Sequence, residues 1–220
     1  MSLQRILALL ALPVVTVFVI AGCASPSPST DSGDKDTDSS ETEDEEDEAD
    51  VPEEGELAEP GTTVGADVWL THSFTSTDDV EALISSRLVS VEKVTDEQYT
   101  FLNETFDEGQ LEGYDVYMIL VEEKKESGDS IEFDADYTFY DPIDKDGEKV
   151  QPITLIGWDE CQTPSFDEAF DTAGGVLTQC LLAAVPEGED GPAGVAYTGG
   201  DEDDNPYDYL DGKPLFFIID

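Results

Sequence analysis

Hydrophobic and polar residues alternate with a period of two through much of residues 61–220. Residues 131–139 alternate without a break, with apolar side chains at the odd positions, which predicts a half-buried strand. Residues 114–121 are largely apolar on both faces, which is typical of a central strand. Further strands are predicted at residues 66–74, 87–94, 153–158, 176–185, 194–198 and 215–219.

Turn and helix signals are fewer than strand signals. Residues 144–147 read Asp-Lys-Asp-Gly and predict a turn between a strand that ends near Tyr140 and one that begins near Lys149. Short helices are predicted at residues 78–85 and 96–106. About eight strands separated by Gly, Pro and Asp predict an all-β fold, an antiparallel β-sandwich.

The N-terminal segment, residues 1–22, has the pattern of an export signal. Arg5 is its only charge, and residues 6–22 form an uncharged run that is short for a bilayer span. Residues 20–23, Ile-Ala-Gly-Cys, resemble the lipobox of bacterial lipoproteins. The resemblance implies a diacylglycerol on the thiol of Cys23 and cleavage before it. A signal-anchor helix with a chance cysteine is the alternative.

The second segment, residues 23–60, is predicted to be a lipidated linker. Residues 24–60 contain no aromatic residue, and residues 31–59 carry 16 acidic residues against the single Lys35. Such a chain cannot bury enough apolar surface to offset its conformational entropy, so we expect a disordered, extended spacer. Cation binding by this tract is an alternative. Residues 61–220 are long enough for one buried core and are predicted to form a single domain.

The net charge excludes some classes of binding partner. The chain has 54 acidic and 9 basic residues, a formal net charge of −45. Phosphates and carboxylates repel, so ordinary nucleic-acid binding is excluded, and electrostatic attachment to anionic lipid is disfavoured. Contact with the membrane is therefore expected through the lipid anchor.

Cysteine usage fits an exported domain. Of the three cysteines, Cys23 is assigned to the lipid, which leaves Cys161 and Cys180. In an oxidising compartment this remaining pair is expected to form a disulfide. Two free buried thiols are the alternative.

Catalytic and zinc chemistry have little support in the sequence. His72 is the only imidazole, and alternation places it with apolar neighbours near a strand end, as a structural histidine. Ser73 beside it points to the opposite face of a regular strand and is no nucleophile for it. Zinc sites usually need clusters of His and Cys. We therefore expect no catalytic residue and no cofactor.

Calcium is the main chemical alternative. Asp201, Asp203, Asn205 and Asp208 offer several oxygen ligands from one loop. A solvated acidic loop is the simpler interpretation of the same residues.

A lipobox, an acidic linker and one β-domain together resemble the secreted and lipid-anchored immunoglobulin-like proteins of actinobacteria, which include telokin-like secreted antigens. The resemblance covers roughly residues 65–220. It rests on the strand at 114–121, the hairpin through Asp146 and Gly147, the cysteines Cys161 and Cys180, and a glycine-rich turn before 215–219. It implies an immunoglobulin-like topology and no established catalytic activity. In that family the central strand often ends in Asn and Gly, whereas Glu-Glu-Lys-Lys follows here.

Two hypotheses for function follow. The first is a non-enzymatic, immunoglobulin-like lipoprotein on the outer face of the cell membrane, acting through contacts with an unidentified protein or envelope partner. The second is a ligand- or Ca²⁺-binding lipoprotein that serves a transporter or sensor. A formed pocket would favour the second hypothesis.

Overall fold

The computed structural model describes residues 52–53, 55–76, 78–106, 109–172, 174–200, 204–210 and 212–219. Within these residues one sheet contains β2 (Leu70–Thr75), β3 (Glu81–Lys93), β4 (Tyr114–Gly128), β6 (Gln151–Ile153) and β7 (Val176–Pro186). The other contains β1 (Thr63–Gly65), β5 (Tyr140–Ile143), β8 (Gly194–Tyr197) and β9 (Leu215–Ile218). The helices are α1 (Asp96–Thr105) and α2 (Glu168–Asp171), with a 3₁₀ turn at Tyr137–Phe139.

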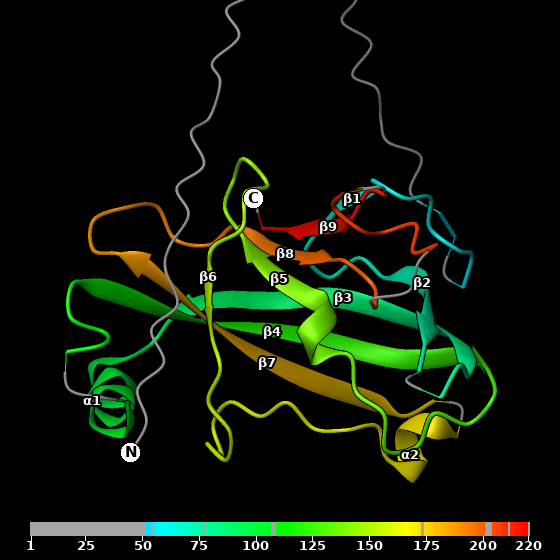
Figure 1. The fold of residues 1–220 in the computed structure, drawn as a ribbon, viewed down its shortest axis with the longest axis horizontal. Helices are drawn as coiled ribbons and strands as arrows, with labels where there is room; N and C mark the ends of the chain where they lie inside the picture. Colours follow the sequence, from blue (N-terminus) through cyan, green and yellow to red (C-terminus); the bar gives the residue numbers. More distant parts are fainter. Residues whose placement is uncertain are drawn as a thin grey trace, which may run out of the picture. The chain divides into compact units, whose positions relative to one another are not determined.

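The two sheets pack as the layers of a β-sandwich (Figure 1), which confirms the predicted all-β fold class. The five-stranded sheet has the order β2-β3-β4-β7-β6, and the four-stranded sheet has the order β1-β9-β8-β5. The apolar run at 114–121 lies in β4, which is the central strand, as predicted. All strand pairs are antiparallel except β1 with β9, which is parallel.

The main core lies between the two sheets. Leu88 on β3 and Ile119 on β4 face Val195 on β8 and Phe217 on β9, and none of the four side chains is exposed to solvent. Removing this apolar surface from water supplies the main driving force for closing the sandwich.

A second cluster covers part of the outer face of the five-stranded sheet. Leu102 of α1 packs there with Val116 and Leu182. The helix begins with a capping box, in which Thr95 Oγ1 accepts from the amide of Gln98 and Gln98 Oε1 accepts from the amide of Thr95. The predicted helix at 96–106 is therefore confirmed.

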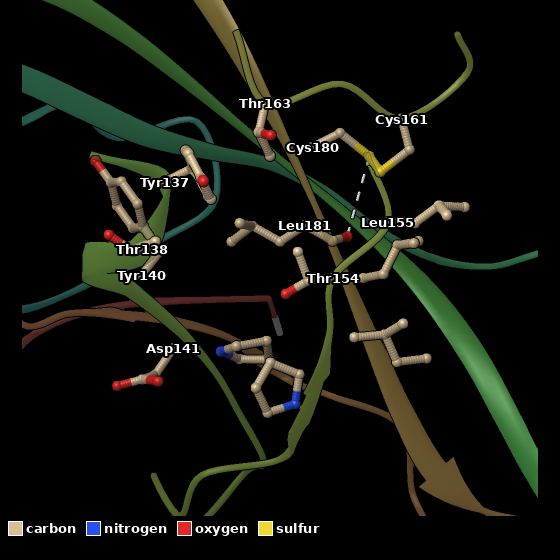
Figure 2. Close-up of a pocket in the computed structure, with 14 residues that line it drawn as sticks. Tyr137, Thr138, Tyr140, Asp141, Thr154, Leu155, Cys161, Thr163, Cys180 and Leu181 are labelled. Carbon is tan, nitrogen blue, oxygen red and sulfur yellow. Dashed lines mark hydrogen bonds between the residues drawn. A yellow bond between two sulfur atoms is a disulfide. The ribbon is translucent and has the colours of Figure 1, made fainter. Parts of the chain in front are cut away.

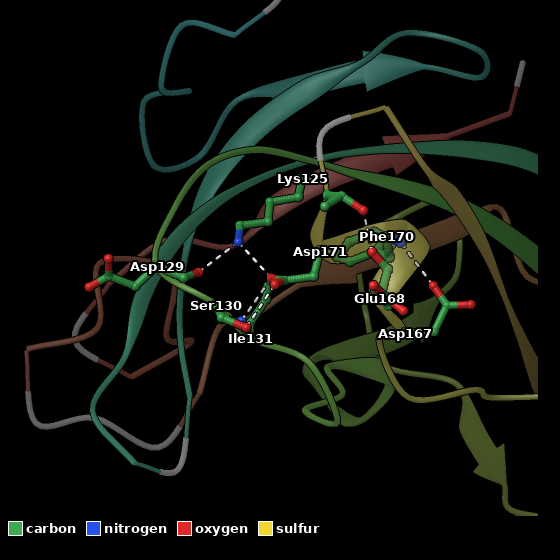
Figure 3. A network of polar contacts seen from close by, with 9 residues as sticks. Lys125, Asp129, Ser130, Ile131, Asp167, Glu168, Phe170 and Asp171 are labelled. Carbon is green, nitrogen blue, oxygen red and sulfur yellow. Dashed lines mark hydrogen bonds and ion pairs between the residues drawn. The ribbon is translucent and has the colours of Figure 1, made fainter.

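A polar cross-link holds the short helix α2, which the sequence analysis did not predict, against the end of β4 (Figure 3). Lys125 Nζ donates to Asp171 Oδ1 over 2.6 Å and to the carbonyl oxygen of Asp129 over 2.7 Å. Asp171 also accepts from the amide of Ile131 and from Ser130 Oγ. The cross-link borders a third apolar cluster, in which the rings of Phe166 and Phe170 stack.

The predicted strand at residues 131–139 is wrong. These residues form turns and the 3₁₀ turn, and Phe133 adopts a φ of 79° with 80% of its side chain exposed. The segment carries the chain from the five-stranded to the four-stranded sheet, so no neighbouring strand pairs with it. As a result Asp136, which alternation placed on the solvent side, is fully buried.

The predicted helix at residues 78–85 is also wrong. Ser76 Oγ accepts from the amides of Asp78 and Val80, which makes a tight turn into β3. Ala82 and Ile84 are then buried on β3. Pairing with β2 and β4 outweighs the weak local helix signal.

Two further boundaries differ from the predictions. Ordered contacts begin before Gly61, because the amide of Ala58 donates to the carbonyl oxygen of Thr71 over 2.8 Å and Ala58 is 2% exposed. The ordered part of the chain therefore begins before residue 60, where the linker was predicted to end. The strand predicted at 153–158 is wrong except at Ile153, which is the last residue of the short β6, and residues 154–158 form a loop. None of the helices in the described residues is long and apolar enough to span a membrane.

Candidate functional site

A chain of polar side chains crosses the interior of the sandwich between the apolar clusters. His72 Nε2 lies 2.7 Å from Ser86 Oγ, and Ser86 Oγ lies 2.7 Å from the phenolic oxygen of Tyr140. Tyr140 donates to Glu123 Oε1 over 2.5 Å. We call these four residues the buried polar chain. His72, Ser86 and Glu123 have no exposed surface, and Tyr140 is 3% exposed.

The hydrogen bonds of this chain run in one direction. Tyr140 has a single hydroxyl hydrogen, which Glu123 accepts. Ser86 must therefore donate to Tyr140, and His72 Nε2 must donate to Ser86. The imidazole is thus a neutral Nε2–H tautomer, and it acts as a donor to the serine hydroxyl.

Burial keeps His72 uncharged. Loss of solvent lowers the pKa of its imidazole to about 3, although the carbonyl oxygen of Ser73, 3.3 Å from Nδ1, partly opposes the shift. The ring packs on Tyr197, with 3.7 Å between the ring centroids. His72 is therefore a buried structural residue, as predicted from the sequence, but in this tautomer Nδ1 has no hydrogen to donate to the carbonyl oxygen of Ser73.

The buried polar chain ends at two carboxyl groups, Glu123 and Asp136, which we call the acid pair. Both side chains have no exposed surface. Burial raises the pKa of Asp136 well above its usual range, and the nearby charge of Glu123 raises it further. Burial also raises the pKa of Glu123, against the bonds that it receives from its neighbours. One proton shared within the pair avoids placing two negative charges in the core.

Unpartnered oxygens mark the acid pair. Glu123 Oε2, both carboxyl oxygens of Asp136 and Oε1 of the buried Gln179 accept no hydrogen bond from a conventional donor. A proton held by Asp136 makes that carboxyl group a hydrogen-bond donor to Glu123 Oε2, which gives this oxygen a partner. Gln179 Nε2 donates to the carbonyl oxygen of Pro164 over 3.2 Å.

A pocket of about 200 Å³ opens beside the buried polar chain (Figure 2). Tyr140 lines it, and it lies between β5 of the four-stranded sheet and β6 and β7 of the five-stranded sheet. Most of its lining is apolar side chains and hydroxyl groups: Tyr137, Thr138, Pro142, Pro152, Ile153, Thr154, Leu155, Thr163 and Leu181. One carboxylate, Asp141, also lines it and pairs with Lys149 Nζ at 2.7 Å. The space lies where β6 ends at Ile153, so that among the described residues no strand pairs with the first half of β7 on this side.

The disulfide forms one wall of this pocket. Cys161 and Cys180 are joined, with 5.0 Å between their Cα atoms. The amide of Cys180 donates to the carbonyl oxygen of Gln162 over 2.9 Å, so the segment after β6 is also bonded to β7 at this point. The predicted pairing thus holds one wall of the pocket in place.

The structure describes two of the four residues that were proposed as calcium ligands. Asn205 and Asp208 are described, whereas Asp201, Asp203 and the lipidation site Cys23 lie outside the described residues. Asn205 Oδ1 accepts from the amide of Tyr207 over 2.9 Å, and its Nδ2 donates to two carbonyl oxygens. Its side chain therefore stabilises the loop itself. In the described part of the chain no group of three or more His, Cys, Asp or Glu side chains is arranged to hold a metal ion.

Sequence reasoning did not find the acid pair or its neighbours. Glu123 belongs to a Glu-Glu-Lys-Lys run that resembles a polar strand end, and Asp136 occupied the polar side of an apparent strand. The sequence did contain a signal for the burial of Glu123. Alternation continued past Val121 places positions 123 and 125 on the inner face of β4.

Comparison with known proteins identifies no family. No family model and no curated protein matches the chain. Among solved structures it is similar to MPT63, a secreted protein from Mycobacterium tuberculosis, at 14% sequence identity and a TM-score of 0.43. The match covers 74% of this chain and 98% of the mycobacterial chain. These values do not show a shared family, so kinship with actinobacterial secreted proteins stays a prediction.

Proposed function

We propose that the protein is a lipid-anchored lipoprotein on the extracytoplasmic face of the cell membrane, where its sandwich serves as a non-enzymatic interaction module. The Ile-Ala-Gly-Cys motif ending at Cys23 supports the anchor, and the acidic segment after it supports a spacer. The Cys161–Cys180 disulfide fits an oxidising compartment. Two acyl chains would hold the protein stably on the membrane.

The state of His72 carries the non-enzymatic part of the proposal. A serine nucleophile needs a base that accepts its proton, and the chain has one imidazole. That imidazole has no exposed surface and donates to Ser86 instead of accepting from it. A substrate would have to enter the closed core to meet either group.

Lipid attachment is tested on the full chain in a bacterial host that processes lipoproteins. We expect the wild-type protein in the membrane fraction, with a diacylglycerol on an N-terminal Cys23 by mass spectrometry. Cys23→Ser should be unprocessed and unlabelled by an alkyne-bearing palmitate, whereas Ser25→Ala should behave as wild type. An unmodified Cys23, or cleavage at another residue, would remove the lipoprotein proposal.

Binding of a small ligand is the second candidate function, and the pocket beside Tyr140 favours it. An apolar cavity of about 150 Å³ holds a benzene molecule, so a pocket of about 200 Å³ suits one ring with a short substituent. Its hydroxyl-bearing walls suit a neutral ligand, since the one carboxylate in the lining, Asp141, is already paired with Lys149. Thermal melts with neutral single-ring compounds test this, with Thr163→Phe as the variant that fills the space. Stabilisation that persists in Thr163→Phe would count against this site.

A further inference from the structure

A second concave surface shares no lining residue with the pocket of Figure 2. It is a groove of about 520 Å³ between the first half of α1 and the loop after β6. Its lining residues are Thr95, Glu97, Gln98, Phe101, Gly157, Trp158, Asp159 and Glu160. We call it the α1 groove. Its volume is within the range of ordinary ligand sites.

Both walls of the α1 groove are fixed in place. Gln98, held by the capping box of α1, donates from Nε2 to Glu160 Oε2 over 2.7 Å across the groove. On the loop side, the amide of Cys161 donates to the carbonyl oxygen of Trp158, and the disulfide ties Cys161 to β7. A pre-organised surface loses little conformational entropy on binding.

Two aromatic rings line the bottom of the α1 groove. Phe101 stacks on Trp158, with 5.6 Å between the ring centroids and an angle of 24° between the planes. Trp158 is 6% exposed, whereas Phe101 is 43% exposed although it is large and apolar. The open face of an aromatic ring attracts organic cations through its quadrupole.

The rim of the groove is negatively charged. Glu97, Asp159 and Glu160 are exposed carboxylates, and no lysine, arginine or histidine is among its lining residues in the described chain. The nearby Lys93 is paired with Asp115 Oδ1 at 2.7 Å. The groove thus combines an aromatic surface with uncompensated negative charge.

We propose that the α1 groove binds the ammonium or guanidinium group of a lysine or arginine side chain on a partner polypeptide. The aromatic rings would contact the apolar stem and the cation, and the carboxylates would pair with the charge. A hydrated divalent cation prefers oxygen ligands and would gain little from the rings. The proposal needs only the folded domain, so it stands or fails independently of the lipid anchor and of the pocket.

The test uses the full chain in non-ionic detergent, in a Trp69→Phe background that leaves Trp158 as the sole tryptophan. The peptide acetyl-Gly-Lys-Gly-amide and its arginine analogue are titrated while the tryptophan emission is recorded, with acetyl-Gly-Gln-Gly-amide as the neutral control. We expect saturable changes for the two basic peptides only. The combined Glu97→Gln, Asp159→Asn and Glu160→Gln variant should bind about tenfold more weakly.

Two controls separate a specific site from general acidity. Glu104→Gln, Glu112→Gln and Glu132→Gln remove the same charge from other exposed positions and should change binding less than about twofold. Phe101→Leu keeps an apolar side chain but loses the ring face, and should weaken binding about fivefold, whereas Phe101→Tyr should not. Unchanged melting temperatures show that the variants are folded.

Three results would overturn the proposal. The first is equal loss of binding in the two charge variants. The second is a Phe101→Leu protein that binds like wild type. The third is an equal response to MgCl₂, or to tetramethylammonium chloride, at the same concentration as the peptide, which would assign the groove to a free cation instead of a partner side chain.

Discussion

Tyr140 on β5 donates its hydroxyl hydrogen to Glu123 on β4, over 2.5 Å, and so joins the two sheets through a polar bond inside an apolar core. This bond sets the direction of the hydrogen bonds back to His72. It also leaves the other carboxyl oxygen of Glu123 for the acid pair. Polar networks of this kind are stable only when their members are satisfied, so their protonation state matters.

The acid pair should make stability fall as pH rises above the ordinary carboxyl pKa of about 4. The pKa of Asp136 and that of Glu123 are raised in the folded state, so the native protein holds more protons than the unfolded chain above about pH 4. This stabilisation is complete below the unfolded pKa and is lost as pH rises through the folded one. The free energy of unfolding is measured with urea at a series of pH values. As pH rises, it should fall less steeply for Asp136→Asn than for wild type, by up to about 1.4 kcal/mol per pH unit. Glu132→Gln is the matched control, and parallel curves for Asp136→Asn and wild type would contradict the shared proton.

His72 should have the opposite pH dependence. Its pKa falls from an ordinary 6.5 to about 3, so the unfolded chain takes up a proton that the native state refuses. The corresponding stability is present above pH 6.5 and is lost as pH falls toward 3, by up to about 1.4 kcal/mol per pH unit. Because the chain has one histidine, its imidazole resonances in NMR spectra are unambiguous. They should not titrate between pH 8 and pH 5, and a midpoint near 6.5 would show that the ring is not buried.

The disulfide should contribute measurably to stability. Cys161 and Cys180 are 19 residues apart, and closing a loop of that length in the unfolded chain is worth about 3 kcal/mol in the chain-entropy account. The combined Cys161→Ala and Cys180→Ala variant should lose about this amount in urea unfolding. Reductant should destabilise the wild type and leave the variant unchanged. A wild-type protein indifferent to reductant, with both thiols open to alkylation, would mean that the bond does not form.

The Lys125–Asp171 pair of Figure 3 should matter more than a surface ion pair. Three bonds from Lys125, Ile131 and Ser130 lower the pKa of Asp171 to about 2, which shows a carboxylate held in its charged form. Lys125→Met leaves this carboxylate without its cation and should cost about 3 kcal/mol in urea unfolding. Lys145→Met breaks an exposed, solvent-screened pair with Asp146 and should leave the free energy of unfolding nearly unchanged. Equal losses in the two variants would contradict a structural role for the buried pair.

Salt should stabilise the domain. Residues 61–220 hold 38 acidic and 7 basic residues, a net charge of −31, and the unfolded chain relieves part of their repulsion. The melting temperature should rise with NaCl and level off as screening saturates, since the Debye length falls from about 10 Å at 0.1 M to about 3 Å at 1 M.

At matched ionic strength, CaCl₂ and MgCl₂ should change the melting temperature equally if the acidic segment that carries Asp203 and Asp208 is only solvated. A stabilisation by Ca²⁺ alone at low concentration, abolished by Asp203→Asn, would reveal a specific site. A melting temperature indifferent to NaCl, MgCl₂ and CaCl₂ would contradict the repulsion itself.

The sequence predicted the architecture better than the site. Residues 114–121 and 176–185 fall in the paired central strands β4 and β7, and residues 96–106 contain α1. In these segments the local pattern and the tertiary environment agree. The buried polar chain was not predicted, because His72, Ser86, Glu123 and Tyr140 lie far apart in the sequence and meet only when the two sheets close.

The sequence by itself determined the strand-rich composition of the domain, its central strand, the helix at 96–106 and the candidate pair of cysteines, because these depend on periodicity and on residue type. Only the tertiary structure decided which alternating segments became strands. Residues 131–139 have the same period as a strand, but their backbone makes isolated bonds, as between Phe133, Asp134 and Phe166, and no continuous ladder, so they turn and bring Asp136 to Glu123. A strand is completed by its partner across the sheet, and neither that partner nor the burial of a carboxyl group is encoded in the local pattern.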